Sequence, residues 1–181
     1  MKKVKGSLVK LLIKPIRANK SGVYDDILSS EGKELTKQRI FDSIWYPYEF
    51  YRNIHDALAR VEAKNNPKDL FQWGQRFGSI LMTSIYKNTI SVINVSRAID
   101  KYKRFHRLVY SWGDLKPELI SDNRLIVTYE NFERDWELYY YISIGWMHKY
   151  LELCLKKPIE FKFHKKSWEG ADWTAYEFSW K

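Results

Sequence analysis

The 181-residue chain lacks several features that would place it in a well-defined class. Cysteine is nearly absent, and the single Cys154 excludes an internal disulfide framework and fits a reducing compartment. The longest uncharged apolar runs, near residues 78–86 and 138–147, are shorter than the roughly 20 residues that a membrane-spanning helix needs. Lys10 and Lys14 interrupt the apolar stretch of the amino-terminal segment, so we expect no export signal and a cytoplasmic protein.

The motifs of the common catalytic and metal sites are also missing. There is no Gly-x-Ser-x-Gly sequence, no phosphate-binding glycine loop and no paired-acid signature. The four histidines are scattered, and none forms a His-x-x-x-His or Cys-x-x-Cys pair. We therefore expect a protein that is not an enzyme and has no metal site. Cys154 lies on an apolar helical stripe and is interpreted as a small core side chain, with a functional or acylated cysteine as the alternative.

Positive charge and aromatic rings are abundant. The formal net charge is +9, which suits an acidic partner, but charges of both signs alternate over most of the chain and favour an ordinary lysine-rich surface. Lys101, Lys103, Arg104 and Arg107 form a basic helical edge that leaves a nucleic-acid or anionic-membrane binder as an alternative. Aromatic residues make up 17% of the chain, with eight tryptophans, which predicts a dense core or a core with an aromatic-lined pocket.

Helical patterns dominate the first 113 residues. Apolar side chains recur at helical spacing over residues 4–18, and a turn at Gly22 leads to a short predicted helix over 23–28. Trp45-Tyr46-Pro47 is interpreted as the start of the next helix, since proline suits a first turn. Asn66-Pro67 predicts the start of a helix that runs to about residue 86. A further helix is expected over about 90–112, ended by Gly113.

The last third has the order β-β-α-β-β. Two hairpins, over about 115–129 and 159–180, show the alternation of strands with one wet face, which indicates an antiparallel sheet. The helix between them, over about 132–155, carries two apolar stripes and should be buried on two sides. We predict a single α+β domain over 1–181, in which a helical layer (1–113) packs on a four-stranded antiparallel sheet (114–181), with the central helix between them.

Several short segments together resemble a known family: Lys5-Gly6-Ser7-Leu8, Trp45-Tyr46-Pro47, the pair Gly74 and Gly78, and the closing Tyr176-Glu177-Phe178-Ser179-Trp180. They are similar to an uncharacterised bacterial family first noted in myxobacteria. That family resembles the superfamily of haem-NO-binding, 4-vinyl-reductase-type (V4R) and Bet3-like domains. The resemblance implies a hydrophobic cavity between helices and sheet, used in the superfamily for haem, small molecules or an acyl chain. It also implies a protein partner or a homodimer through the helical face.

Haem-binding members of that superfamily have an axial histidine on the helix before the sheet and a Tyr-x-Ser-x-Arg signature that holds the propionates. His106 matches the first requirement. Tyr129, Asn131 and Glu133 stand in place of the second, and a glutamate there would repel the propionates. We therefore expect no cofactor, and the sequence argues against haem.

We predict a non-catalytic sensor or adaptor that binds an apolar or aromatic small molecule, or an acyl chain, between helices and sheet. A ligand-free protein-interaction module is the first alternative. A haem-based gas sensor, or a binder of nucleic acid or an anionic membrane, is the second, although nucleic acid is not the expected partner. Gly74 and Gly78 either admit a neighbouring helix or leave room for a ligand. The predicted cavity residues are Trp73, Gly74, Phe77, Gly78, Tyr102, His106, Tyr140 and Trp146.

Overall fold

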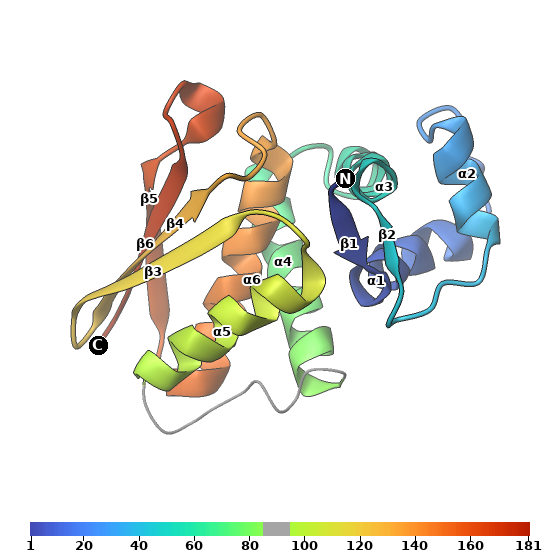
Figure 1. Cartoon of the computed structure of the whole chain (residues 1–181). Coiled ribbons are helices and arrows are strands. Elements are labelled where there is room, and N and C mark those ends of the chain that lie inside the picture. Colours follow the sequence, from blue (N-terminus) through green and yellow to red (C-terminus); the bar gives the residue numbers. More distant parts are fainter. Residues whose placement is uncertain (85–94) are drawn as a thin grey trace. The chain divides into compact units, whose positions relative to one another are not determined.

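The computed structural model describes residues 1–84 and 95–181 (Figure 1). The chain forms two compact units, one of residues 1–66 with 108–111 and the other of residues 67–107 with 112–181. We call these unit 1 and unit 2. That the two units act as a single domain stays a prediction. None of the helices in the described ranges combines the length and the apolar character that a membrane span requires.

Unit 1 contains three helices and a small two-stranded sheet. Its elements are β1 (Lys3–Lys5), α1 (Gly6–Ala18), α2 (Ser30–Lys37), β2 (Trp45–Pro47) and α3 (Tyr48–Glu62). The strands pair antiparallel, with Val4 opposite Tyr46. The helix predicted over 4–18 is present from Gly6 onward, because residues 3–5 pair with β2 instead.

Two predictions for unit 1 were wrong. Residues 45–47 form a strand and not a helical turn, since Pro47 has an extended backbone and the helix begins only at Tyr48. Residues 23–28 form turns, and the second helix of the unit lies later, at Ser30–Lys37. The side chain of Ser29 caps this helix by accepting a hydrogen bond from the backbone N–H of Gly32 at 3.0 Å.

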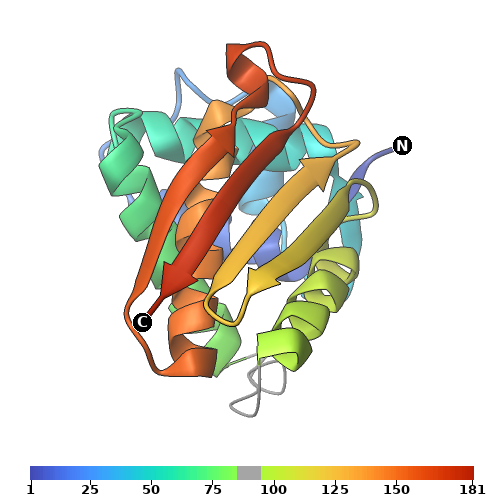
Figure 2. The same ribbon diagram turned by 90° about the vertical axis from the view of Figure 1, so that its left-hand side faces the viewer.

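Among its described residues, unit 2 contains the larger sheet and three α-helices. Its elements are α4 (Pro67–Thr83), α5 (Val95–Val109), β3 (Asp114–Ser121), β4 (Arg124–Glu130), α6 (Glu137–Leu155), β5 (Ile159–Lys165) and β6 (Thr174–Trp180). The sheet has the order β3-β4-β6-β5 and every neighbouring pair is antiparallel, which confirms the predicted α+β class and the predicted sheet (Figure 2). The predicted helix ends at 86 and 90 fall outside the described residues.

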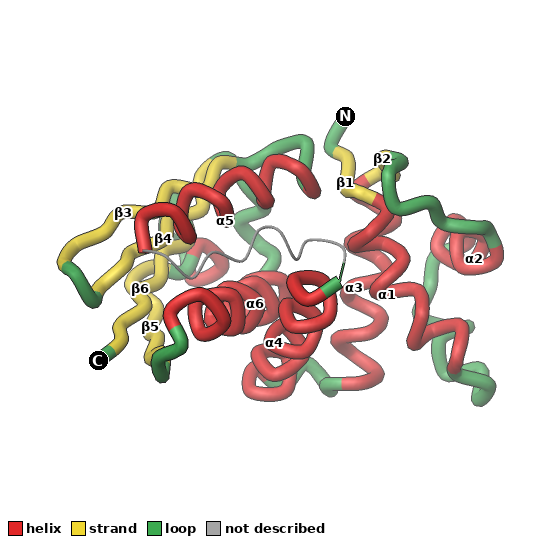
Figure 3. The backbone as a smooth tube through the Cα atoms, turned by 90° about the horizontal axis from the view of Figure 1, so that it is seen from below, coloured by secondary structure: helices red, strands yellow, loops and turns green. Residues whose placement is uncertain are grey.

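The core of unit 2 is built around α6. Twelve of its 19 residues are buried, among them Cys154. One side of the helix faces the sheet, and α4 lies along another side (Figure 3). The prediction from the two apolar stripes, that this helix is buried on two sides, is therefore confirmed.

Glycines set the contact between α4 and α6. A Cβ atom added to Gly74 would lie 2.0 Å from the carbonyl oxygen of Ile142, and one added to Gly145 would lie 2.0 Å from that of Phe71. Real Cβ atoms do not come this near to backbone oxygen. The backbones of the two helices therefore approach more closely than any side chain at these two positions would allow.

Replacing Gly145 by alanine tests this contact. In an exposed helix the change would stabilise by about 1 kcal/mol, but here the new methyl group meets the backbone of Phe71. We expect unfolding in urea to show a loss of about 2 kcal/mol or more. The control is Gly32→Ala in α2, where the nearest atom is the side-chain oxygen of Asn53. That side chain can move at the cost of its hydrogen bond from the N–H of Ser29, so a smaller loss of stability is expected. Equal stability of Gly145→Ala and the unaltered protein would contradict the proposed close contact.

These helices leave one face of the sheet open (Figure 2). A strongly paired carboxylate, that of Glu177, lies on the sheet. Glu177 on the central strand β6 is only 6% exposed and lies 2.9 Å from a guanidinium nitrogen of Arg124, 2.9 Å from His164 and 3.4 Å from the ammonium of Lys162. Hydrogen bonding to Arg124, followed by that to His164, lowers the pKa of Glu177 to about 2.

This carboxylate makes the free energy of unfolding of unit 2 depend on pH in the acid range. The folded pKa lies below the ordinary value of 4.5, so the stabilisation is complete above about pH 4.5 and is lost as the pH falls toward 2. We expect Glu177→Gln to lower the free energy of unfolding by about 1–2 kcal/mol at pH 7, because the partner cations are largely exposed. The difference should shrink as the pH is lowered. Glu160→Gln, on exposed β5, is the control, and a difference that does not depend on pH would refute the ion-pair explanation.

Candidate ligand-binding site

All eight predicted cavity residues lie in unit 2, but in separate groups. Gly74 and Gly78 on α4 meet α6, and a Cβ on Gly78 would lie 2.3 Å from the indole ring of Trp146. The rings of Trp73 and Phe77, both half-buried, contact each other on α4 at 5.1 Å. Their role in ligand binding stays a prediction.

The remaining three predicted residues lie on α5 and α6. Tyr140 stacks on Trp168 at 5.3 Å and donates its hydroxyl hydrogen to the carbonyl oxygen of Glu133 at 2.9 Å. Tyr102 and His106 lie one turn apart on α5, and both are buried. The structure therefore brings Tyr102 and His106 together at α5, and places Tyr140 among the rings near the second hairpin.

His106 is the most distinctive titratable group of this region. Its side chain is 3% exposed, and its ring lies edge-on to Tyr129 at 5.7 Å and to Phe132 at 5.9 Å. Burial lowers the pKa of His106 to about 4, against the opposing influence of Asp114. The imidazole is therefore neutral at physiological pH.

The turn after α5 orients this imidazole. The imidazole of His106 forms hydrogen bonds with the backbone of Gly113 and Trp112, and both raise its pKa. A contact that favours the protonated ring must accept its hydrogen, so the backbone groups involved are the carbonyl oxygens. Gly113 has a φ of +81°, and a Cβ there would lie 2.4 Å from the ring of Phe132. A neutral imidazole that donates one N–H to a carbonyl carries a lone pair on its other nitrogen, which is the form that ligates metals.

A cluster of tyrosine hydroxyls lies beside His106 and was not predicted from the sequence. The hydroxyl of Tyr129 is 2.6 Å from Oγ of Ser143, which is 3.4 Å from the hydroxyl of Tyr176. Tyr102 joins the cluster through Tyr129, and burial raises the pKa of all three tyrosines. The only local signal was Ser143 itself, a polar residue among the apolar stripes of α6.

This cluster changes the interpretation of the Tyr-Asn-Glu positions. Tyr129 directs its hydroxyl to Ser143 in the core, and the amide of Asn131 donates to the carboxylate of Asp114 at 3.0 Å. Neither side chain is arranged to hold an anionic group in this structure.

Aromatic rings occupy the space between α5 and α6. Phe105 meets Trp146 edge-on at 4.9 Å, and Tyr102 contacts Tyr150 at 5.2 Å. A planar ligand between these helices would have to separate those rings. Trp146 is 93% buried, and its indole N–H has no hydrogen-bond acceptor among the described residues. A buried N–H in that state costs roughly 1–3 kcal/mol, so a ligand that offers an acceptor would gain from it.

Three surface hollows lie elsewhere. One of about 410 Å³ is lined by Phe71, Tyr141 and Phe161 together with polar residues of α4. A second, of about 350 Å³, lies near Asn123 and Trp180, and a third is in unit 1. These three hollows are lined by residues outside the predicted set. In the described ranges, no cluster of His, Cys, Asp and Glu suits a bound metal ion.

Comparison with known proteins gives a fold and no family. No family model matches the chain, and no curated protein matches it. Among solved structures it is similar to an oxygen-binding H-NOX domain related to soluble guanylate cyclases, with a TM-score of 0.65, 14% identity, and 98% and 95% of the two chains covered. It is also similar to the Fe(II) unliganded H-NOX protein from K. algicida (TM-score 0.64, 14% identity, coverage 98% and 96%).

A structure solved to probe haem distortion in the H-NOX family matches equally well, with a TM-score of 0.65, 13% identity, and 98% and 95% coverage. This likeness contradicts the expectation of no cofactor, because haem is the group studied in that H-NOX structure. That expectation gave one substituted propionate position more weight than the buried histidine. The relation to the myxobacterial family and to V4R or Bet3-like domains stays a prediction. The chain has the fold of H-NOX domains.

Proposed function

We propose that the chain is a non-catalytic sensor domain that binds a planar apolar ligand beside α5, and that this ligand is haem. The observation that carries the proposal is the neutral, buried imidazole of His106, oriented by the backbone after α5. His106 would ligate the iron. The rings of Phe105 and Trp146, which contact each other in this structure, would have to separate so that they and Tyr129 flank the porphyrin. The iron would supply a binding site for a diatomic gas.

The path of the chain suggests how binding would be signalled. Residues 108–111, which include the last two residues of α5, belong to unit 1. Within that unit Tyr110 bridges Val4, the backbone N–H of Ser111 donates to the carbonyl of Lys3 at 3.0 Å, and the N–H of Lys3 donates to Oγ of Ser111 at 2.8 Å. A ligand that displaces α5 would therefore pull on β1 through these bonds. A protein partner or a second copy of the chain would read the change.

A second candidate is an apolar or aromatic molecule other than haem, or an acyl chain. The indole N–H of Trp146 favours it, since a carbonyl or ether oxygen on such a ligand would supply an acceptor. Native mass spectrometry of the purified protein separates the two, because it reports the mass of any retained molecule.

Haem reconstitution tests the first proposal. We expect the protein to take up one haem and show a Soret band, His106→Gly to lose most of that band, and added imidazole to restore it. The ring nitrogen is the ligand in each case. His164→Ala is the control, because His164 lies on the open face of the sheet.

Two outcomes would contradict haem ligation by His106. One is a reconstituted protein without a Soret band, and the other is a band that His106→Gly leaves unchanged. A retained apolar molecule of another mass would favour the second candidate.

A further inference from the structure

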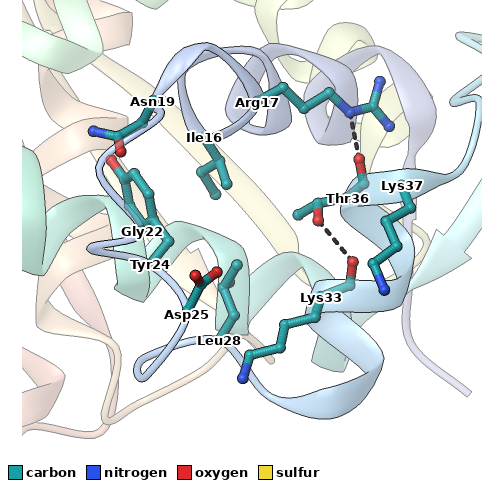
Figure 4. A pocket seen from close by; sticks show the side chains of 10 residues that line it. All are labelled: Ile16, Arg17, Asn19, Gly22, Tyr24, Asp25, Leu28, Lys33, Thr36 and Lys37. Atoms are coloured by element: carbon teal, nitrogen blue, oxygen red, sulfur yellow. Dashed lines mark hydrogen bonds between the residues drawn. The ribbon is translucent and has the colours of Figure 1, made fainter.

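Unit 1 contains a half-open hollow of about 350 Å³ between the end of α1, the following loop and α2 (Figure 4). A volume of this size suits a small metabolite. Ten residues line it: Ile16, Arg17, Asn19, Gly22, Tyr24, Asp25, Leu28, Lys33, Thr36 and Lys37. The proposed ligand site of unit 2 includes none of them.

The floor of this hollow is apolar and firmly held. Ile16, Tyr24 and Leu28 are each at least 93% buried, and Figure 4 shows Ile16 and Leu28 between Tyr24 on one side and the lysines on the other. The hydroxyl of Tyr24 donates to the carboxylate of Glu62 on α3, and burial raises the pKa of Tyr24, so the ring stays in place as a neutral wall. An aliphatic or aromatic group would be sheltered from water against these three side chains.

Cations line the opposite wall. Lys33 is half-buried, and its ammonium has no carboxylate within ion-pair distance among residues 1–84 and 95–181. In the described part of the chain, the one ion pair of Lys37 is a long, exposed contact of 3.7 Å with Glu34. Both ammonium groups therefore keep most of their charge available for a ligand.

Arg17 neutralises the carbonyl oxygens that would otherwise repel an anion from this wall of the hollow. The wall is the carboxyl end of α2, where unpaired carbonyl oxygens would repel negative charge. The guanidinium of Arg17 donates to the carbonyl oxygens of Thr36, at 2.5 Å, and of Gln38. It satisfies these acceptors and leaves a positive charge beside them.

Asp25, on the loop opposite, is the one acidic residue of the lining. Its exposed carboxylate lines the same hollow. Three cations against one carboxylate still favour an anion, and Asp25 only reduces the attraction in proportion to the charge of the ligand.

We propose that this hollow binds a small organic monocarboxylate, with its carboxylate held by Lys33 and Lys37 and its apolar body against Ile16, Tyr24 and Leu28. An inorganic anion would lack the apolar contacts, and a neutral hydrocarbon would lack the contacts with the lysines. Each should therefore bind more weakly than the monocarboxylate. The site is independent of the proposed haem site and stands whether or not unit 2 binds haem.

Titration of the ¹⁵N-labelled full chain by NMR tests the proposal, with hexanoate, benzoate and inorganic phosphate as probes. We expect hexanoate or benzoate to shift the amide signals of Gly22, Tyr24 and Lys33, with a dissociation constant of about 1 mM or tighter. Phosphate should cause much smaller shifts. The double variant Lys33→Gln, Lys37→Gln should weaken carboxylate binding about tenfold or more, since each exposed pair contributes up to about 1 kcal/mol.

Lys14→Gln is the matched control, because Lys14 is an exposed lysine of α1 outside the hollow. The unperturbed parts of the same spectra report whether each variant is folded. The proposal is overturned if neither carboxylate shifts these signals, if phosphate binds as well as the carboxylates, or if the double variant binds like Lys14→Gln.

Discussion

The close contact between the backbones of α4 and α6 is the constraint on which the rest of unit 2 depends. Gly74 and Gly145 allow it, because each presents no side chain where the partner helix has a carbonyl oxygen. With α4 this near on one side and the sheet on the other, α6 is excluded from water along most of its length. That position aligns Ser143 with the hydroxyls of Tyr129 and Tyr176, and directs Trp146 toward the rings of α5.

The chemistry of the candidate site follows from this burial. An imidazole in water would be partly charged near neutral pH, whereas burial keeps His106 neutral and able to act as a ligand. The same exclusion of water keeps the neighbouring tyrosines protonated. Because α5 leads directly to Tyr110, which pairs with Val4 of β1, the helix that carries His106 is one of the covalent connections between the two units.

Local patterns predicted the parts of the fold that depend on periodicity. Alternating strands and the two stripes of α6 indicated the sheet and the doubly buried helix, and both are present. The strand at Trp45–Pro47 was missed, since a proline suits both a helix start and an edge strand, and only its pairing with Lys3–Lys5 decides. The helix Ser30–Lys37 was not predicted, because it is polar and contains too few apolar residues to show a helical periodicity. The tyrosine cluster depends on side chains from β4, α6 and β6, which no local window brings together. His106 was singled out from its helix, and its role as a ligand stays a prediction. The expectation of no cofactor, which relied on Glu133, is contradicted by the likeness to H-NOX structures.

Hydrogen exchange of the backbone amides of α6 most directly tests whether this helix is the centre of unit 2. Amides of residues 142–151 are expected to exchange only through complete unfolding of the unit, and to be among the slowest in the chain. Amides of the exposed, polar α2 should exchange much faster. If α6 exchanged as rapidly as α2, the helix would be open to solvent on one side, and neither the neutral histidine nor the tyrosine cluster could persist.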